Sequence, residues 1–148
     1  MFDYKHPTKG LTSFNLLLYL DTITEAMKFS LDKRERFCIL QLEEEKLLSN
    51  YSPNLKSEML GLQRDGFKNV ILDLAKVVFI DSSGLSALLV GVRLAKENKG
   101  TFVITNINPH IQKLIKISQL ESILTIVPTL AESIDYVMME ELDRDLRG

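Results

Sequence analysis

Residues 70–84 read Val-Ile-Leu-Asp-Leu-Ala-Lys-Val-Val-Phe-Ile-Asp-Ser-Ser-Gly, an almost continuous apolar run that ends in a polar turn. The run predicts a strand from Val70 to Ile80 that is covered on both faces. The following segment, Leu85 to Lys96, is amphipathic and predicts a helix. The turn is therefore expected at the amino end of a helix, where free N–H groups and a partial positive charge favour a phosphate.

Further strands and helices alternate along the chain. The other strands are predicted at Phe29–Leu31 (an edge strand), Phe37–Leu42, Thr101–Thr105 and Leu124–Val127. The other helices are predicted to begin at Ser52-Pro53, at Asn108-Pro109 and at the capping box Thr129-x-x-Glu132. This alternation indicates an α/β layer around a largely parallel sheet.

Apolar spacing predicts which helix faces are buried. The last helix is expected to bury Ile134, Met138 and Leu142. The helix after the turn has a core face made by Leu85, Leu88, Leu89 and Val92. A second apolar stripe on that helix, Ala87, Val90 and Leu94, is either more core or the rim of a partner groove.

The 148 residues suit one compact domain, predicted at 27–148, preceded by an extension at 1–26. The extension is interpreted as a mis-assigned start or a loosely packed segment. Alternatively, Leu11, Phe14 and Leu18 line one face of a docking or dimerising helix.

Composition argues against several classes of function. The net charge is −2, with no basic patch that would attract nucleic acid. No run reaches the ~18–20 apolar residues of a membrane span, so no membrane contact is predicted. The single cysteine, Cys38, lies within a predicted strand, which fits a core residue in a reducing cytoplasm.

The residues offer little for catalysis. The two histidines, His6 and His110, lie far apart and lack neighbours at metal-ligand spacing, so neither a metal nor a cofactor is predicted. A serine nucleophile needs a base within hydrogen-bonding reach, and none is suggested by the sequence. A protein that is not an enzyme is therefore predicted, with Ser82 or Ser83 acting as a helix cap or as a switch.

Three segments together carry a family resemblance. They are residues 70–74 with 78–85, residues 100–104 followed by Asn108-Pro109 and Leu114, and residues 117–120. This pattern resembles the STAS domain and, more narrowly, the bacterial anti-sigma-factor antagonists. The resemblance runs from about residue 27 to the C-terminus, and residues 1–26 have no counterpart in it.

The resemblance implies a mixed, mostly parallel sheet of four or five strands with helices packed mainly on one face. It also implies partner switching. In that family the antagonist binds an anti-sigma factor that is also a serine kinase, and binding releases the sigma factor. The kinase then phosphorylates the first serine of the motif, which matches Ser82, and a serine phosphatase resets the switch.

The expected partner-binding residues surround this serine. They are Ser49, Asn50, Tyr51, Asp81, Ser82, Ser83, Gly84, Ser86, Ala87 and Val90. One departure from the family is Leu48, which stands where an Asp near the phosphorylation site is usual. The alternatives are a STAS scaffold or nucleotide-sensing module that is never phosphorylated, and a hydrolase using Ser82 or Ser83.

Overall fold

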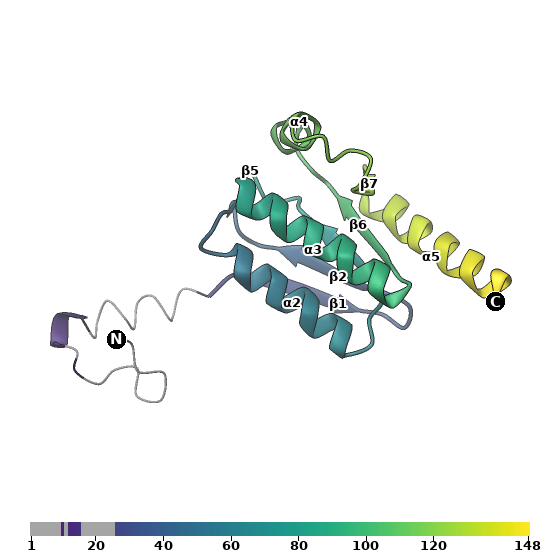
Figure 1. Cartoon of the computed structure of the whole chain (residues 1–148), viewed down its shortest axis with the longest axis horizontal. Helices are drawn as coiled ribbons and strands as arrows, with labels where there is room; N and C mark the ends of the chain where they lie inside the picture. Colours follow the sequence, from purple (N-terminus) through teal and green to yellow (C-terminus); the bar gives the residue numbers. More distant parts are fainter. Residues whose placement is uncertain (1–9, 11, 16–25) are drawn as a thin grey trace.

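The computed structural model describes residues 10, 12–15 and 26–148 (Figure 1). The helix predicted from Leu11, Phe14 and Leu18 lies largely outside these residues. The described domain has the elements β1 (Phe29–Lys33), β2 (Cys38–Leu42), β3 (Lys46–Leu47), α2 (Ser52–Arg64), β4 (Asn69–Asp73), β5 (Phe79–Ile80), α3 (Ser82–Asn98), β6 (Thr101–Thr105), α4 (Pro109–Ile117), β7 (Ile126–Val127) and α5 (Leu130–Arg147).

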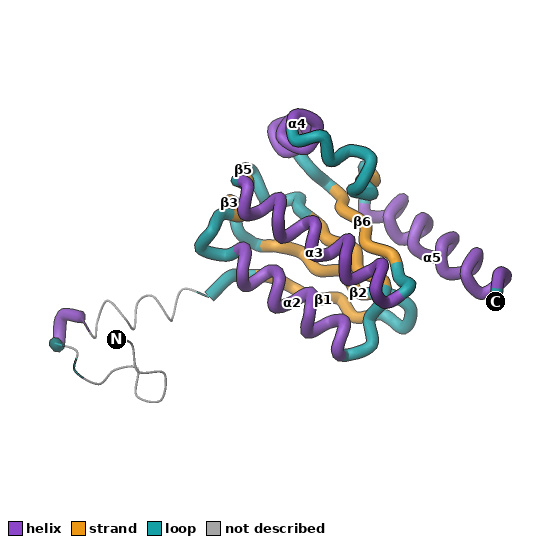
Figure 2. The backbone as a smooth tube through the Cα atoms, in the orientation of Figure 1, coloured by secondary structure: helices purple, strands orange, loops and turns teal. Residues whose placement is uncertain are grey.

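The main sheet has five strands in the order β1-β2-β4-β6-β7. Figure 2 shows β1, β2 and β6 with α2 and α3 in front of them. β1 is an antiparallel edge strand, and its Phe29 pairs with Leu42. The other pairings are parallel. Every residue of β4 and β6 is buried, as expected for strands covered on both faces. The predicted mixed, mostly parallel sheet is confirmed.

The strand predicted from Val70 to Ile80 is divided in two. β4 ends at Asp73, whose carboxylate accepts the Ala75 N–H at 3.0 Å and turns the chain. The chain then forms β5, which pairs with β3 in a separate two-stranded sheet through Lys46–Phe79 and Leu47–Ile80. The end of the apolar run thus lies beside the segment that leads into residues 48–51.

Helices cover the two faces of the main sheet unequally. α2 and α3 lie side by side over one face (Figure 1), and buried residues of α4 join the same core cluster. α5 packs on the other face, where Val137 meets a smaller cluster that includes Ile71 and Val103. Cys38 belongs to the larger cluster, and burial raises the pKa of its thiol to about 11.

The buried face of α5 differs from the predicted one. Met138 and Leu142 are exposed, and the buried residues are Ser133, Val137 and Glu141. Glu141 can be buried because its carboxylate accepts hydrogen bonds from Asn69 and Arg144, at 2.9 and 2.8 Å. The prediction holds in part for Ile134, which is half-buried against the smaller cluster. It is wrong for Met138 and Leu142, because Val137 and the hydrogen-bonded Ser133 and Glu141 occupy the inward positions.

No helix in the described part of the chain is both long and apolar enough to span a bilayer.

The assignment of the α5 face can be tested with two neighbouring substitutions. Val137→Asp should lower the free energy of unfolding by more than about 2 kcal/mol, because it buries an unpaired carboxylate. Met138→Asp, at a 40% exposed position, should change it by less than about 0.5 kcal/mol. Urea denaturation measures both, and a larger loss for Met138→Asp would show that the face is wrongly assigned.

Candidate functional site

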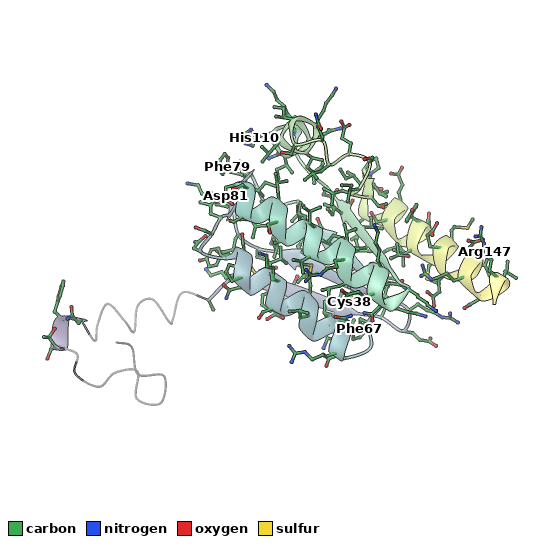
Figure 3. The ribbon with its side chains drawn as sticks, viewed as in Figure 1. Cys38, Phe67, Phe79, Asp81, His110 and Arg147 are labelled. Atoms are coloured by element: carbon green, nitrogen blue, oxygen red, sulfur yellow. The ribbon has the colours of Figure 1, made fainter. Side chains whose placement is uncertain are left out.

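The Asp-Ser-Ser-Gly turn lies at the amino end of α3, next to β5 and close to α4 (Figure 3). Ile80, the last residue of β5, is buried and anchors the turn to the core. Ser82 is the first residue of α3, and its side chain is exposed. The parallel pairing of β3 with β5 brings the segment after Leu47 to the same end of the molecule.

Asp81 caps α3, which excludes the alternative in which Ser82 or Ser83 is the helix cap. The backbone of Asp81 is extended, and its carboxylate oxygen Oδ1 accepts the Gly84 N–H at 3.0 Å. The Ser83 hydroxyl donates to the same oxygen at 2.5 Å. Asp and Ser are both good capping residues, and three of them stand in a row here. Because Asp81 fills this role, the Ser82 hydroxyl is left at the surface with no hydrogen-bonding partner among the described residues.

The Asp81 carboxylate keeps its negative charge beside Ser82. Its pKa is held below the ordinary 3.8, first by the hydrogen bond from the Ser83 hydroxyl and then by the Gly84 N–H. The backbone N–H groups of Ser83 and Ser49 lower the pKa further. The Asp81 N–H also donates to the Leu47 carbonyl at 3.4 Å, which places the start of the 48–51 loop beside the turn.

A buried serine also joins this loop to the turn. The Ser52 hydroxyl lies 2.8 Å from the Leu48 carbonyl, to which it donates, and 3.0 Å from the Ser83 hydroxyl. Ser52 was predicted to cap α2, but Tyr51 occupies the cap position and Ser52 is the first helical residue. Its hydroxyl therefore connects two elements instead of capping one.

The structure gathers most of the predicted partner-binding residues at one end of the domain. Ser49, Asn50, Ser82 and Ser86 are exposed, and Tyr51, Asp81, Ser83 and Val90 are partly exposed. Ser86 follows Ser82 by one helical turn and shares its face of α3.

Gly84 and Ala87 are corrections to this set, because both are buried. Ala87 is completely buried and Leu94, from the same apolar stripe, is nearly so, because α3 contacts α2 as well as the sheet. Of the stripe, only Val90 retains exposed surface. The stripe is therefore mainly core, and its side chains beyond Val90 offer little to a partner.

An exposed apolar pair beside the turn was missed by the sequence reasoning. Val78 and Phe79 are 58% and 41% exposed, although the apolar run predicted that they are covered. The Phe79 ring stacks on His110 of α4, with centroids 5.1 Å apart and planes inclined by 22°. Asn108 supports the pair, since its amide donates to the Val78 carbonyl at 2.8 Å. The sequence did offer one signal for this exposure, because Phe79 precedes the polar turn by only two residues.

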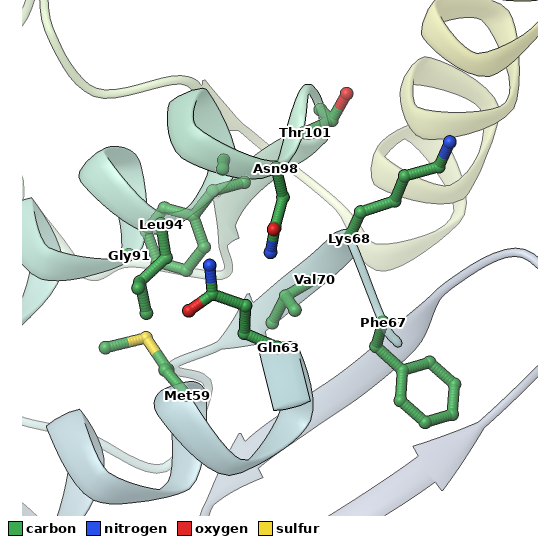
Figure 4. Close-up of a pocket in the computed structure, with 11 residues that line it drawn as sticks. Met59, Gln63, Phe67, Lys68, Val70, Gly91, Leu94, Asn98 and Thr101 are labelled. Carbon is green, nitrogen blue, oxygen red and sulfur yellow. The ribbon is translucent and has the colours of Figure 1, made fainter. Parts of the chain in front are cut away.

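The hollow between α2 and α3 is too small for a ligand, whereas a larger one of about 410 Å³ lies beside β7 and is lined by Ile107, Gln112 and Val127 among others. A cavity of about 20 Å³ lies between the carboxyl-terminal halves of α2 and α3, lined by Met59, Gln63, Leu94 and Asn98 among others (Figure 4). This volume accommodates about one water molecule. The cavity is also at the opposite end of both helices from Ser82. Within the described ranges, no three His, Cys, Asp or Glu side chains come together as metal ligands would.

Gly84 is required by the close approach of the 47–48 segment. A Cβ at Gly84 would lie 2.7 Å from the Leu47 carbonyl oxygen and 3.1 Å from the Ile80 Cβ. Gly84→Ala should therefore lower the free energy of unfolding by about 1–3 kcal/mol, through overpacking against backbone. The control is Gly61→Ala in α2, where a Cβ meets nothing within 4 Å. It should stabilise by up to about 1 kcal/mol, and equal effects in thermal melts would contradict the close approach.

The Asp81 cap also predicts a pH dependence. Because the pKa of Asp81 is lower in the folded state than its ordinary 3.8, its stabilising effect is complete above that pH. It is lost as the pH falls through the folded-state pKa. An NMR titration of the carboxyl carbon should give a midpoint below 3.8, and Asp81→Asn should remove this part of the acid sensitivity. A midpoint at or above 3.8 would contradict the capping geometry.

Comparison with known proteins places the chain among characterised families. The STAS domain profile matches residues 28–133. A Bordetella bronchiseptica protein, BtrV, whose name assigns it provisionally to the anti-sigma factor antagonists, is 28% identical over 97 residues, which are 66% of this chain and 83% of BtrV. The names of the matched relatives denote regulatory proteins, as the sequence predicted, and not enzymes.

Solved structures agree in fold. An anti-sigma factor antagonist from Mycobacterium paratuberculosis superposes with a TM-score of 0.68 at 18% identity, covering 76% of this chain and 95% of that one. The Bacillus cell fate determinant SpoIIAA in its phosphorylated form gives 0.59 at 20% identity, covering 74% and 99%. Because the profile spans well over half of its length, this chain belongs to the STAS domain family.

Proposed function

We propose that this protein is an anti-sigma-factor antagonist whose docking to an anti-sigma factor is switched by phosphorylation of Ser82. The observation that carries the proposal is the exposed Ser82 hydroxyl at the first position of α3, where Asp81 has already supplied the cap. A modifying enzyme can reach this hydroxyl without undoing a structural hydrogen bond. The family and the names of the relatives support an antagonist role.

The choice between the two serines follows from their surroundings. The Ser83 hydroxyl is held by Asp81 and lies against the buried Ser52. Using Ser83 as the phosphate acceptor would require breaking the short hydrogen bond to the carboxylate. Ser82 carries no such constraint among the described residues, so it is the expected acceptor.

A phosphate on Ser82 should change docking much more than folding. It adds about −1.5 to −2 charges next to the Asp81 carboxylate. The amino end of α3 offsets part of this repulsion, typically by less than ~2 kcal/mol. A partner surface packed closely over Ser82 would have to accept or desolvate the dianion, and the complex should dissociate. The solved phosphorylated form of SpoIIAA, which shares the fold, supports tolerance of a phosphate by this architecture.

The partner is expected to span more than the serine. The 48–51 loop, which Ser52 joins to the turn, offers exposed residues, and so does the Val78–Phe79 pair with His110 just before the turn. An anti-sigma factor that is also a serine kinase would contact both of these groups, and a serine phosphatase would restore the free hydroxyl. These steps would take place in the cytoplasm.

A phosphorylation-independent scaffold is the second candidate, and Leu48 favours it. Leu48 lacks the carboxylate that the family usually provides at this place. Only its backbone carbonyl is engaged, and it accepts the N–H groups of Tyr51 and Ser52 and the Ser52 hydroxyl. Kinase recognition through that carboxylate is not available to this chain. Stable docking without phosphate transfer would support the scaffold.

The test mixes the purified protein with the anti-sigma-factor kinases encoded in the same genome and MgATP. Mass spectrometry should place one phosphate on Ser82, and Ser82→Ala should bind the kinase constitutively without accepting phosphate. Ser82→Asp should abolish binding and leave the melting temperature nearly unchanged, because the residue is exposed at a helix amino end.

The matched control is Ser122→Asp, at an exposed serine in the turn after α4, which should bind like the parent protein. If Ser82→Asp binds as tightly as the parent, exclusion by charge is wrong. Transfer of phosphate to Ser83 would contradict the choice of acceptor.

A further inference from the structure

We propose that Ser52 is a positioning residue, whose buried hydroxyl fastens the 48–51 loop to the phosphoacceptor turn so that a partner meets one preformed surface. The expected effect on partner binding rests on the proposed function. The attachment of the loop to the turn can be measured on the free protein. It concerns a residue that neither the periodicity nor the motif of the sequence distinguished from an ordinary helix cap.

The contacts form a short chain between two elements distant in sequence. Ser52 is 1% exposed, and its Oγ lies 2.8 Å from the Leu48 carbonyl oxygen and 3.0 Å from the Ser83 Oγ. Ser83 Oγ is in turn 2.5 Å from Asp81 Oδ1, the same oxygen that receives the Gly84 N–H. Ser52 therefore links the amino end of α2 to the cap of α3.

The number of available protons identifies Ser52 as the donor of the hydrogen bond between the two serines. Each serine hydroxyl donates one proton, and the Asp81 carboxylate, being ionised, donates none. Ser83 gives its proton to Asp81 over the shortest contact, so the proton that joins the two serines comes from Ser52. That single proton is shared between the Leu48 carbonyl and the Ser83 oxygen.

Loss of the Ser52 hydroxyl should loosen the joint without unfolding the loop. The Leu48 carbonyl also accepts the N–H groups of Tyr51 and Ser52, at 3.0 and 2.9 Å, so it stays paired when the hydroxyl is removed. Within the described part of the chain, no other side chain donates a hydrogen bond to the Ser83 oxygen. The main cost of Ser52→Ala is thus the connection between loop and turn.

The connection matters because it fixes the second end of the 48–51 loop. The β3–β5 pairing holds the start of the loop through Leu47 and Ile80, and Ser52 holds its end. Between these two points the exposed Ser49 and Asn50 are carried on a segment fixed relative to Ser82. A surface that is already ordered spares a partner the entropy of ordering it.

The test compares Ser52→Ala with Ser57→Ala, an exposed serine on the same helix, by amide hydrogen exchange in the free protein. Ser52→Ala should speed exchange of the Tyr51 and Gly84 amides by about 3–10-fold, the loss expected for one net hydrogen bond. The Ser133 amide in α5 should be unaffected, and Ser57→Ala should change none of the three. Uniform acceleration throughout the domain, or no acceleration, would overturn the proposal.

A double-mutant comparison separates positioning from simple destabilisation. The combined Ser52→Ala, Ser83→Ala protein should exchange about 3–10-fold more slowly at Gly84 than the product of the single effects, because both variants remove the same contact. Multiplicative effects would show that the serines are not coupled. If Ser52→Ala fails to fold, Ser52→Cys replaces it, since a thiol keeps the shape but donates weakly.

The last measurement distinguishes this inference from the proposed function. With an anti-sigma-factor kinase that binds the parent protein, Ser52→Ala should bind about tenfold more weakly while Ser57→Ala binds normally. Equal binding of the two variants would overturn the positioning role even where Ser82 is phosphorylated. If no kinase binds the parent, the proposed function fails, and the exchange experiments still decide whether Ser52 joins the two elements.

Discussion

The hydrogen bond from the Gly84 amide to the Asp81 carboxylate fixes where α3 begins, and the properties of the site follow from that boundary. With Asp81 in the cap position, Ser82 becomes the first helical residue and its hydroxyl faces outward. The same carboxylate engages the Ser83 hydroxyl, which in turn approaches Ser52 and the neighbouring helix. The Asp81 side chain thus leaves the Ser82 hydroxyl exposed and holds the Ser83 hydroxyl in a hydrogen bond.

The arrangement separates the requirements of folding from those of recognition. Apolar packing of α2, α3 and the sheet positions the ends of the helices, and it involves residues on the far side of the backbone from Ser82. The polar groups at the surface of the turn are held by short hydrogen bonds and by the absence of a side chain at Gly84. Charge can consequently change at the surface while the core below retains its contacts.

Local patterns predicted the order of strands and helices, and two caps as well. Asn108 and Thr129 accept the N–H groups of Ile111 and Glu132, as their spacing indicated. The same reasoning considered only Ser82 and Ser83 as the cap of α3 and overlooked Asp81. Asp and Ser suit a cap equally well, so only the backbone geometry decides. It also missed the β3–β5 pair, because two residues per strand show no periodicity. The inward Glu141 of α5 depends on Asn69, a partner 72 positions away.

Cys38 gives this protein a practical advantage for spectroscopy. It is the only cysteine of the sequence, it is completely buried, and the pKa of its thiol is raised to about 11. Maleimide and related reagents attack the thiolate, so the native thiol should stay unlabelled at neutral pH. A new cysteine at Asn50, on the exposed loop, would then carry a fluorophore or spin label selectively. The signal of this label would report partner docking in real time, in a protein that is otherwise unchanged.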